Sequence, residues 1–145
     1  MKDLLLITPP FTQLNTPYPA TAYLKGFLNT KNISSYQIDL GIEVILEIFS
    51  KKGVTEIFNV KPENLSENAQ RIFALKEEYI KTIDEVIAFL QNKKPTLARQ
   101  ICSMNFLPEA SRFNQLDDME YAFGNMGLQD KAKHLATLYL EDLSD

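Results

Sequence analysis

The loop after the first apolar run is the stretch of this sequence best suited to bind a ligand. Residues 4–7 are apolar, and the loop over 8–17 is polar and rich in proline. In open α/β sheets, ligands bind beyond the carboxyl ends of the strands, and a helix N-terminus after such a loop favours anions. Prolines stand where a phosphate-binding loop carries glycines, so we expect a stiff wall for a flat ligand. A rigid structural turn is the alternative interpretation.

Asp39 is a second candidate, because it ends the next predicted strand and precedes Gly41. An acid at this position of a nucleotide-binding fold can hold a ribose hydroxyl. The glycine fingerprint of such folds is missing here, so the pattern favours a helix N-cap for Asp39.

The remaining chemically active residue types are isolated. His134 is the only histidine and Cys102 the only cysteine. Their spacing supplies no Ser-His-Asp or Cys-His arrangement, and metal sites normally need several ligands. We interpret His134 as a half-exposed helical residue and Cys102 as a small core residue. An acidic group is formed by Asp117, Asp118 and Glu120. Its carboxylates could hold a hard cation, but a solvated helix face is the favoured interpretation.

Composition limits the class of protein. The chain has 145 residues, of which 45% are hydrophobic and 23% charged, with a net charge of -4. It can therefore bury a core, and it has the length of one ordinary domain. Its lysine pairs, at 51–52 and 93–94, are expected near helix ends, where cations suit the helix dipole. No basic stripe is present, which disfavours nucleic acid as the main partner.

The sequence also predicts no membrane partner. The apolar run over 4–7 is stopped by Thr8-Pro9-Pro10, so it is too short for a signal peptide or a membrane span. A single cysteine excludes an internal disulfide and suits a reducing compartment. We expect a cytoplasmic protein.

The first third of the chain reads as strand, helix, strand, helix. Strands are predicted over 3–8 and 35–40, and helices from about Pro19 and over 42–52, with Gly53 as the stop of the second helix. The apolar face of the first helix is formed by Ala20, Tyr23, Leu24, Phe27 and Leu28.

The rest of the chain reads as helical. Apolar spacing predicts one long helix over 65–90, ended by Pro95, and shorter helices at 96–105, 115–123 and 128–143. The long helix could form a coiled-coil seam, but packing on its own domain is favoured, because a seam needs several uninterrupted heptads.

These elements predict an α/β, mostly helical fold: a truncated doubly wound, Rossmann-like opening with two parallel strands plus a helical region. Residues 1–53 form the opening, and 54–145 a helical extension of the same compact unit. Two parallel strands seldom make an independent sheet, so we expect a fragment whose further strands follow Asp145.

Acids near the end of the last helix, Glu141 and Asp142, oppose its dipole and fit an interrupted helix; a frayed natural terminus is the alternative. An unpaired strand edge predicts that the fragment self-associates as a homo-oligomer.

The opening residues resemble a known family. The segments LLLITPP (4–10) and YPATAYLKGFL (18–28), followed by Asp39-Leu40-Gly41, resemble the start of cobalamin-binding-domain radical SAM proteins. The resemblance covers about residues 4–53. It implies that the whole protein is an iron–sulfur oxidoreductase-like enzyme, whose amino-terminal doubly wound domain holds cobalamin. A later radical SAM barrel, as the rest of the same polypeptide, would hold an iron–sulfur cluster and S-adenosylmethionine.

The resemblance also implies site residues. Pro9 and Pro10 would border the corrin ring, and the further cofactor-binding candidates are Asn15, Thr16 and Tyr18, because their loop should lie beside the helix N-terminus. The chain has neither the three-cysteine cluster motif nor D-x-H-x-x-G, which supplies a cobalt-ligating histidine in many cobalamin domains. We therefore expect no catalytic residue, metal site or cofactor in this chain alone. The alternative is a helical protein-interaction module without a cofactor, with the 65–90 helix as its working surface.

Overall fold

The computed structural model describes residues 3–12, 18–60, 63–116 and 127–144. It is an α/β, mostly helical structure, as the sequence predicts, and it divides into two compact units, Met1–Ile48 (unit 1) and Phe49–Asp145 (unit 2). The boundary predicted after residue 53 falls inside the first helix of unit 2.

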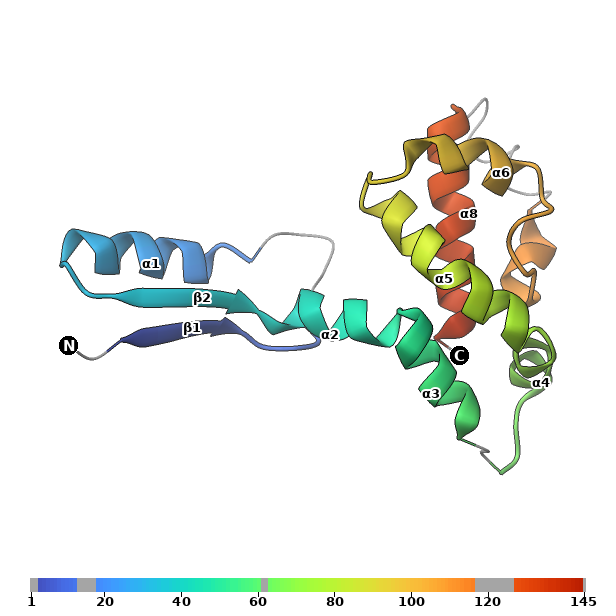
Figure 1. The fold of residues 1–145 in the computed structure, drawn as a ribbon, viewed down its shortest axis with the longest axis horizontal. Coiled ribbons are helices and arrows are strands. Elements are labelled where there is room, and N and C mark those ends of the chain that lie inside the picture. The colour runs from blue at the N-terminus through green and yellow to red at the C-terminus, as the bar shows by residue number, and fades with distance from the viewer. Residues whose placement is uncertain (1–2, 13–17, 61–62, 117–126, 145) are drawn as a thin grey trace. The chain divides into compact units, whose positions relative to one another are not determined.

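Unit 1 is a parallel strand–helix–strand motif followed by a second helix (Figure 1). Its elements are β1 (Leu4–Thr8), α1 (Ala20–Thr30), β2 (Ser35–Asp39) and α2 (Leu40–Ile48). β1 pairs with β2 in parallel, with a register that runs from Leu4 opposite Ser35 to Thr8 opposite Asp39. Both predicted strands and their parallel pairing are therefore confirmed.

α1 covers one face of this two-stranded sheet. The Gln37 side-chain amide donates to the Thr21 hydroxyl at 3.0 Å, and the Lys25 ammonium donates to the carbonyl oxygen of Ser35. The helix ends because Asn32 adopts the left-handed region, with φ of 54°. The N–H of Ile33 then bonds back to the Leu28 carbonyl at 3.0 Å, which closes the helix and directs the chain into β2.

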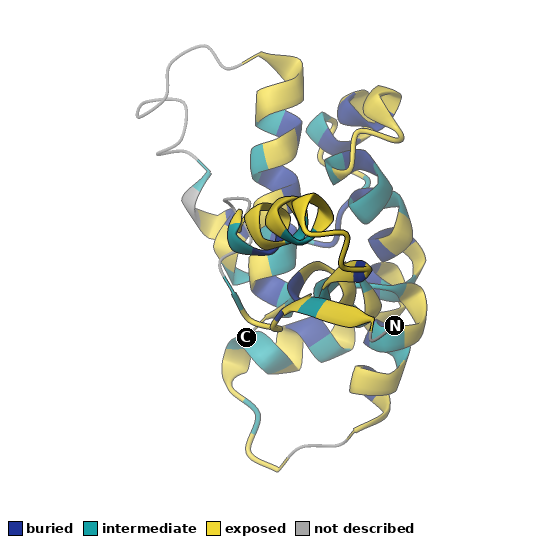
Figure 2. Ribbon diagram, turned by 90° about the vertical axis from the view of Figure 1, so that its left-hand side faces the viewer, coloured by how far each residue is buried: buried dark blue, intermediate teal, exposed yellow. Residues whose placement is uncertain are grey.

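Unit 2 is helical. Its elements are α3 (Lys51–Asn59), α4 (Glu67–Ala74), α5 (Lys76–Leu90), α6 (Ala98–Cys102) and α8 (Leu128–Leu143), with short 3-10 helices η1 (Pro95–Leu97) and η2 (Ser111–Gln115). α5 and α8 supply most of the fully buried apolar residues of the described chain, and Figure 2 colours the ribbon at buried residues dark blue. These are Tyr79, Ile83, Val86 and Phe89 from α5 and Ala132, Leu135, Ala136 and Tyr139 from α8. The apolar stripe of α5 is thus used inside its own unit, and the favoured packing interpretation is confirmed.

The predicted helix over 42–52 was wrong at its end. The helix stops at Ile48, and Ser50 becomes the N-cap of α3, where its hydroxyl accepts from the Gly53 N–H at 3.0 Å. Gly53 therefore lies in a first turn instead of stopping a helix. The lysines at 51–52 lie at the start of a helix, where the dipole does not favour them. Lys94 does follow a helix end, and its ammonium contacts the Glu85 carboxylate at 2.6 Å.

The long helix predicted over 65–90 is two helices. α4 stops at Ala74, Leu75 leaves helical geometry, and α5 begins at Lys76. α5 ends at Leu90, where Asn92 takes φ of 59°, so asparagine and not Pro95 terminates it.

Among the later helices, 128–143 is confirmed as α8. The predicted 96–105 helix is the shorter η1 and α6. The helix predicted over 115–123 lies outside the described residues beyond residue 116, and η2 precedes it. The acidic group at 117, 118 and 120 lies outside the described residues. No helix in the described part of the chain combines the length and apolar character that a membrane span requires.

Candidate functional site

The carboxyl edge of the unit 1 sheet brings together the ends of both strands. Thr8 lies opposite Asp39 in the register, and Pro9 and Pro10 follow β1 directly. The Asp39 carboxylate accepts a hydrogen bond from the Ile42 N–H at 3.2 Å, so Asp39 caps α2, as the sequence favours. In open sheets, ligands bind beyond the carboxyl ends of the strands, and here Thr8, Pro9, Pro10 and Asp39 lie at that edge.

The turn after β1 lies against the start of α2. The Thr12 hydroxyl donates to the Pro9 carbonyl oxygen at 3.0 Å, and Phe11 between them has φ of 61°. Gly41 is the contact point: a Cβ there would lie 3.1 Å from both Thr12 Oγ1 and Asp39 Oδ1 and 3.5 Å from the Pro9 oxygen. The absence of a side chain at Gly41 lets the turn approach the helix this closely.

Two of the predicted site residues, Pro9 and Pro10, lie exposed at this edge directly after β1. Tyr18 is 56% exposed and lies two residues before α1. Asn15 and Thr16 lie outside the described residues. The sequence reasoning did not single out Thr12 as a contact or Gly41 as the point where the turn meets α2. The one sequence feature that points to this contact is the glycine two residues after Asp39, at position 41.

The chemistry of the edge follows from these groups. It presents oxygen atoms, namely the Asp39 carboxylate, the Pro9 carbonyl and the Thr12 hydroxyl, beside exposed proline rings. The carboxylate cap occupies the helix N-terminus and opposes the binding of a second anion there. The edge therefore favours a ligand that combines an apolar surface with neutral N–H or O–H donors.

Comparisons of the chain with family models, with curated proteins and with solved structures find no match. The function must therefore be argued from the sequence and the geometry.

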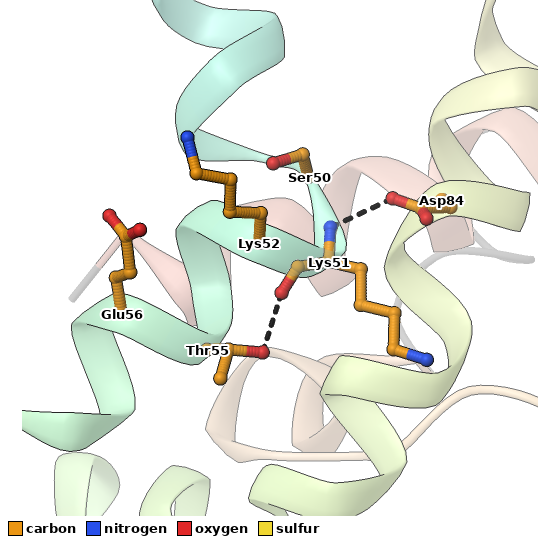
Figure 3. Close-up of a pocket in the computed structure, with 6 residues that line it drawn as sticks. All are labelled: Ser50, Lys51, Lys52, Thr55, Glu56 and Asp84. Carbon is orange, nitrogen blue, oxygen red and sulfur yellow. Dashed lines mark hydrogen bonds between the residues drawn. The ribbon is translucent and has the colours of Figure 1, made fainter.

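A cleft lined by polar side chains lies in unit 2, where α3 begins (Figure 3). The Lys51 backbone N–H donates to the Asp84 carboxylate at 2.8 Å, and the Thr55 hydroxyl donates to the Lys51 carbonyl at 2.6 Å. With Ser50 capping the same turn, side chains of unit 2 already occupy this helix N-terminus. The cleft is accounted for by the joining of α3 to α5.

The buried polar groups of unit 2 hold helices together. The Tyr139 hydroxyl donates to the Tyr79 carbonyl at 3.2 Å and lies 3.0 Å from the Thr82 hydroxyl. Burial is the main cause that raises the pKa of both tyrosines well above the usual range. The fully buried Asp142 accepts from the Arg112 N–H at 3.1 Å, so this acid near the end of α8 stabilises the start of η2.

The isolated histidine and cysteine behave as the sequence indicates. His134 is half-buried in α8, and Cys102 packs against the core of unit 2. Burial raises the pKa of the Cys102 thiol, which disfavours its reactive thiolate form. Within the described residues, no group of three or more His, Cys, Asp or Glu could hold a metal ion.

Proposed function

We propose that this chain is the amino-terminal, cobalamin-binding-type part of a radical SAM iron–sulfur oxidoreductase-like protein, and that it is not catalytic alone. One observation carries the proposal. The parallel β1–α1–β2 motif presents exposed Pro9 and Pro10 at the carboxyl edge of the sheet, and α2 starts there on Asp39. Doubly wound domains bind their ligands at such an edge.

The composition of the edge favours a corrin over a nucleotide phosphate. Proline rings offer apolar contact to a flat macrocycle, and the corrin periphery carries neutral amide groups. The Asp39 carboxylate and the Thr12 hydroxyl are suited to accept hydrogen bonds from such amides. A pyrophosphate would instead meet the negative charge of Asp39.

The residues of this chain fit one wall of a cobalamin site. Pro9, Pro10 and Tyr18 would supply apolar contacts, and Asp39 and Thr12 would orient the amide periphery. None of these residues is a histidine, so they supply no histidine ligand to cobalt.

In this proposal, the iron–sulfur cluster binds to another part of the same polypeptide. Bound cobalamin and S-adenosylmethionine would supply the group-transfer and radical chemistry. An iron–sulfur cluster needs several thiolates, whereas this chain has one cysteine. The role of this chain is to border and orient cobalamin. Its partner is the radical SAM barrel of the same polypeptide, and the protein acts in the cytoplasm.

The alternative class, a helical interaction module without a cofactor, has less support from the geometry. Its proposed working surface is the 65–90 region, and the apolar residues of α5 there are buried against unit 2 itself, for example Ile83 and Phe89. A partner of this region would have to bind its polar side.

Equilibrium dialysis with hydroxocobalamin tests the proposal on two proteins, the 145-residue chain and the product of the complete open reading frame. We expect a saturable low-micromolar site in the complete product and none in the chain alone, because the chain supplies one wall. In the complete product, Pro10→Gly and Tyr18→Ala should each weaken binding roughly tenfold, equivalent to about 1.4 kcal/mol. Phe27→Ala, on exposed α1 surface, is the matched control.

Two results would reject this account. A complete product without a cobalamin site contradicts the cofactor assignment. A tight site on the 145-residue chain that Pro10→Gly abolishes contradicts the assignment of a single wall.

A further inference from the structure

Phe11 is the most exposed large apolar residue in the described part of the chain, at 81%. It lies between Pro10 and Thr12 in the turn that follows β1, at the carboxyl edge of the unit 1 sheet. An aromatic ring stabilises a fold mainly by leaving water, and this ring remains in contact with water. Packing inside unit 1 therefore does not account for an aromatic residue at this position.

The backbone of Phe11 is also unusual. Its φ is 61°, in the left-handed region, which bulky residues rarely adopt. Of the other described non-glycine residues with positive φ, three are asparagines, which adopt this geometry more readily, and the fourth, Met104, follows the end of α6. Glycine is the default residue for such a turn, so phenylalanine makes the turn less stable than glycine would.

Contacts on both sides of Phe11 hold the turn in this conformation. The Thr12 hydroxyl donates to the Pro9 carbonyl oxygen at 3.0 Å, and the pyrrolidine ring of Pro10 fixes the φ of the residue before Phe11. A Cβ at Gly41 would lie 3.1 Å from Thr12 Oγ1, so the turn lies directly against the start of α2. The exposed ring of Phe11 is therefore carried by a turn whose neighbours restrain it.

An exposed ring on a strained backbone is typical of a ligand contact. Strained residues persist where surrounding contacts hold them, and they cluster at binding and active sites. Aromatic rings favour contact with other flat ring systems, and the same edge presents the exposed rings of Pro9 and Pro10.

We propose that Phe11 is a further cofactor-binding residue of this edge and contacts the corrin ring of cobalamin together with Pro9 and Pro10. This inference rests on the proposed function and extends it, because the resemblance of the opening residues assigns no role to Phe11. The side chain of Phe11 supplies the aromatic part of the apolar wall.

Equilibrium dialysis with hydroxocobalamin on the product of the complete open reading frame tests the contact. Phe11→Gly removes the ring and keeps the turn, because glycine adopts a positive φ without strain. We expect Phe11→Gly to weaken binding roughly tenfold, whereas Phe11→Tyr, which retains an aromatic ring, should bind within about twofold of the wild type. Tyr23→Ala is the matched control, because Tyr23 is 77% exposed on α1; it should leave the affinity unchanged.

Hydrogen exchange of the 3–12 segment, measured on the 145-residue chain, separates a binding role from a structural one. Glycine relieves the left-handed strain at position 11, so exchange in Phe11→Gly should be as slow as in the wild type or slower. Faster exchange in Phe11→Gly would mean that the ring stabilises the turn, and it would overturn the inference.

The dialysis results distinguish failure of this inference from failure of the proposed function. Equal affinity of the wild type and Phe11→Gly, or an equal loss with Tyr23→Ala, would overturn the role of Phe11 and leave the proposed function standing. A wild-type complete product that binds no hydroxocobalamin would reject the proposed function and the role of Phe11 together.

Discussion

The Asp39 carboxylate lies 3.2 Å from the Ile42 N–H and caps the first turn of α2. Removing the cap in Asp39→Ala should destabilise unit 1 by about 1 kcal/mol, whereas Asp39→Asn keeps an acceptor and should cost only a few tenths. Hydrogen exchange of peptides from residues 18–48, measured by mass spectrometry, compares the two variants. Equal losses in Asn and Ala would mean that the charge of Asp39, and not its capping bond, stabilises the edge.

Gly41 and Gly26 provide a matched pair of helical glycines. Alanine is the better helix former, so Gly26→Ala, with no heavy atom within 4 Å of the added Cβ, should stabilise unit 1 by about 0.5–1 kcal/mol. Gly41→Ala should lose that gain, because its Cβ meets Thr12 Oγ1 and Asp39 Oδ1 at 3.1 Å. Hydrogen exchange of the 3–12 segment should rise in Gly41→Ala alone. If both variants gain equally, the turn does not rest on Gly41.

The two buried tyrosines of unit 2 should respond oppositely to loss of their hydroxyls. Tyr139→Phe removes hydrogen bonds to the Tyr79 carbonyl and Thr82, so it should lower the free energy of unfolding by about 1–2 kcal/mol. The Tyr79 hydroxyl has no hydrogen-bond partner within the described residues. Tyr79→Phe should therefore be neutral or stabilise by up to about 1 kcal/mol. Urea unfolding followed by far-ultraviolet circular dichroism measures both, and a larger cost for Tyr79→Phe would contradict this reading of the core.

Stability should fall at alkaline pH. Burial raises the pKa of Tyr79 and Tyr139 in the folded state, so above the unfolded value of about 10 the unfolded chain releases protons that the folded chain retains. The stability is present below pH 10 and is lost as pH rises further, by up to about 1.4 kcal/mol per pH unit for each tyrosine. Urea midpoints at pH 9 and pH 11 test this. The double variant Tyr79→Phe and Tyr139→Phe should show a shallower decline; an unchanged slope would assign it to other groups.

Sequence patterns located the strands and the last helix because these depend on local composition. The unbroken apolar run before Pro9 specifies the strand β1, and the helical spacing over 128–143 specifies α8. The ends of helices were harder, because Asn32 and Asn92 stop α1 and α5 in left-handed geometry. Asparagine adopts that geometry less often than glycine, so sequence gives it less weight.

Breaks inside an apolar pattern were also missed. The spacing of apolar residues continues through Leu75, although the helix does not. The division between the two units also falls inside the stretch predicted as one helix over 42–52, and Ser50 caps α3 just after it. Apolar spacing alone therefore does not locate a break between helices.

The site was predictable in its position and not in its contacts. Pro9 and Asp39 follow strands, so their place at the carboxyl edge was predictable from chain order. The approach of Thr12 to Gly41 accompanies the left-handed conformation of Phe11, which the sequence does not predict.

Iron and sulfide analysis after anaerobic reconstitution tests the central assignment most directly. The 145-residue chain and the product of the complete open reading frame are reconstituted side by side, with a Cys102→Ala variant of each as control. We predict no stoichiometric cluster on the chain and roughly four iron and four sulfide per complete product, as in a [4Fe–4S] cluster, unaffected by Cys102→Ala. A complete product without a cluster, or a stoichiometric cluster on the 145-residue chain, would contradict the assignment to the radical SAM class.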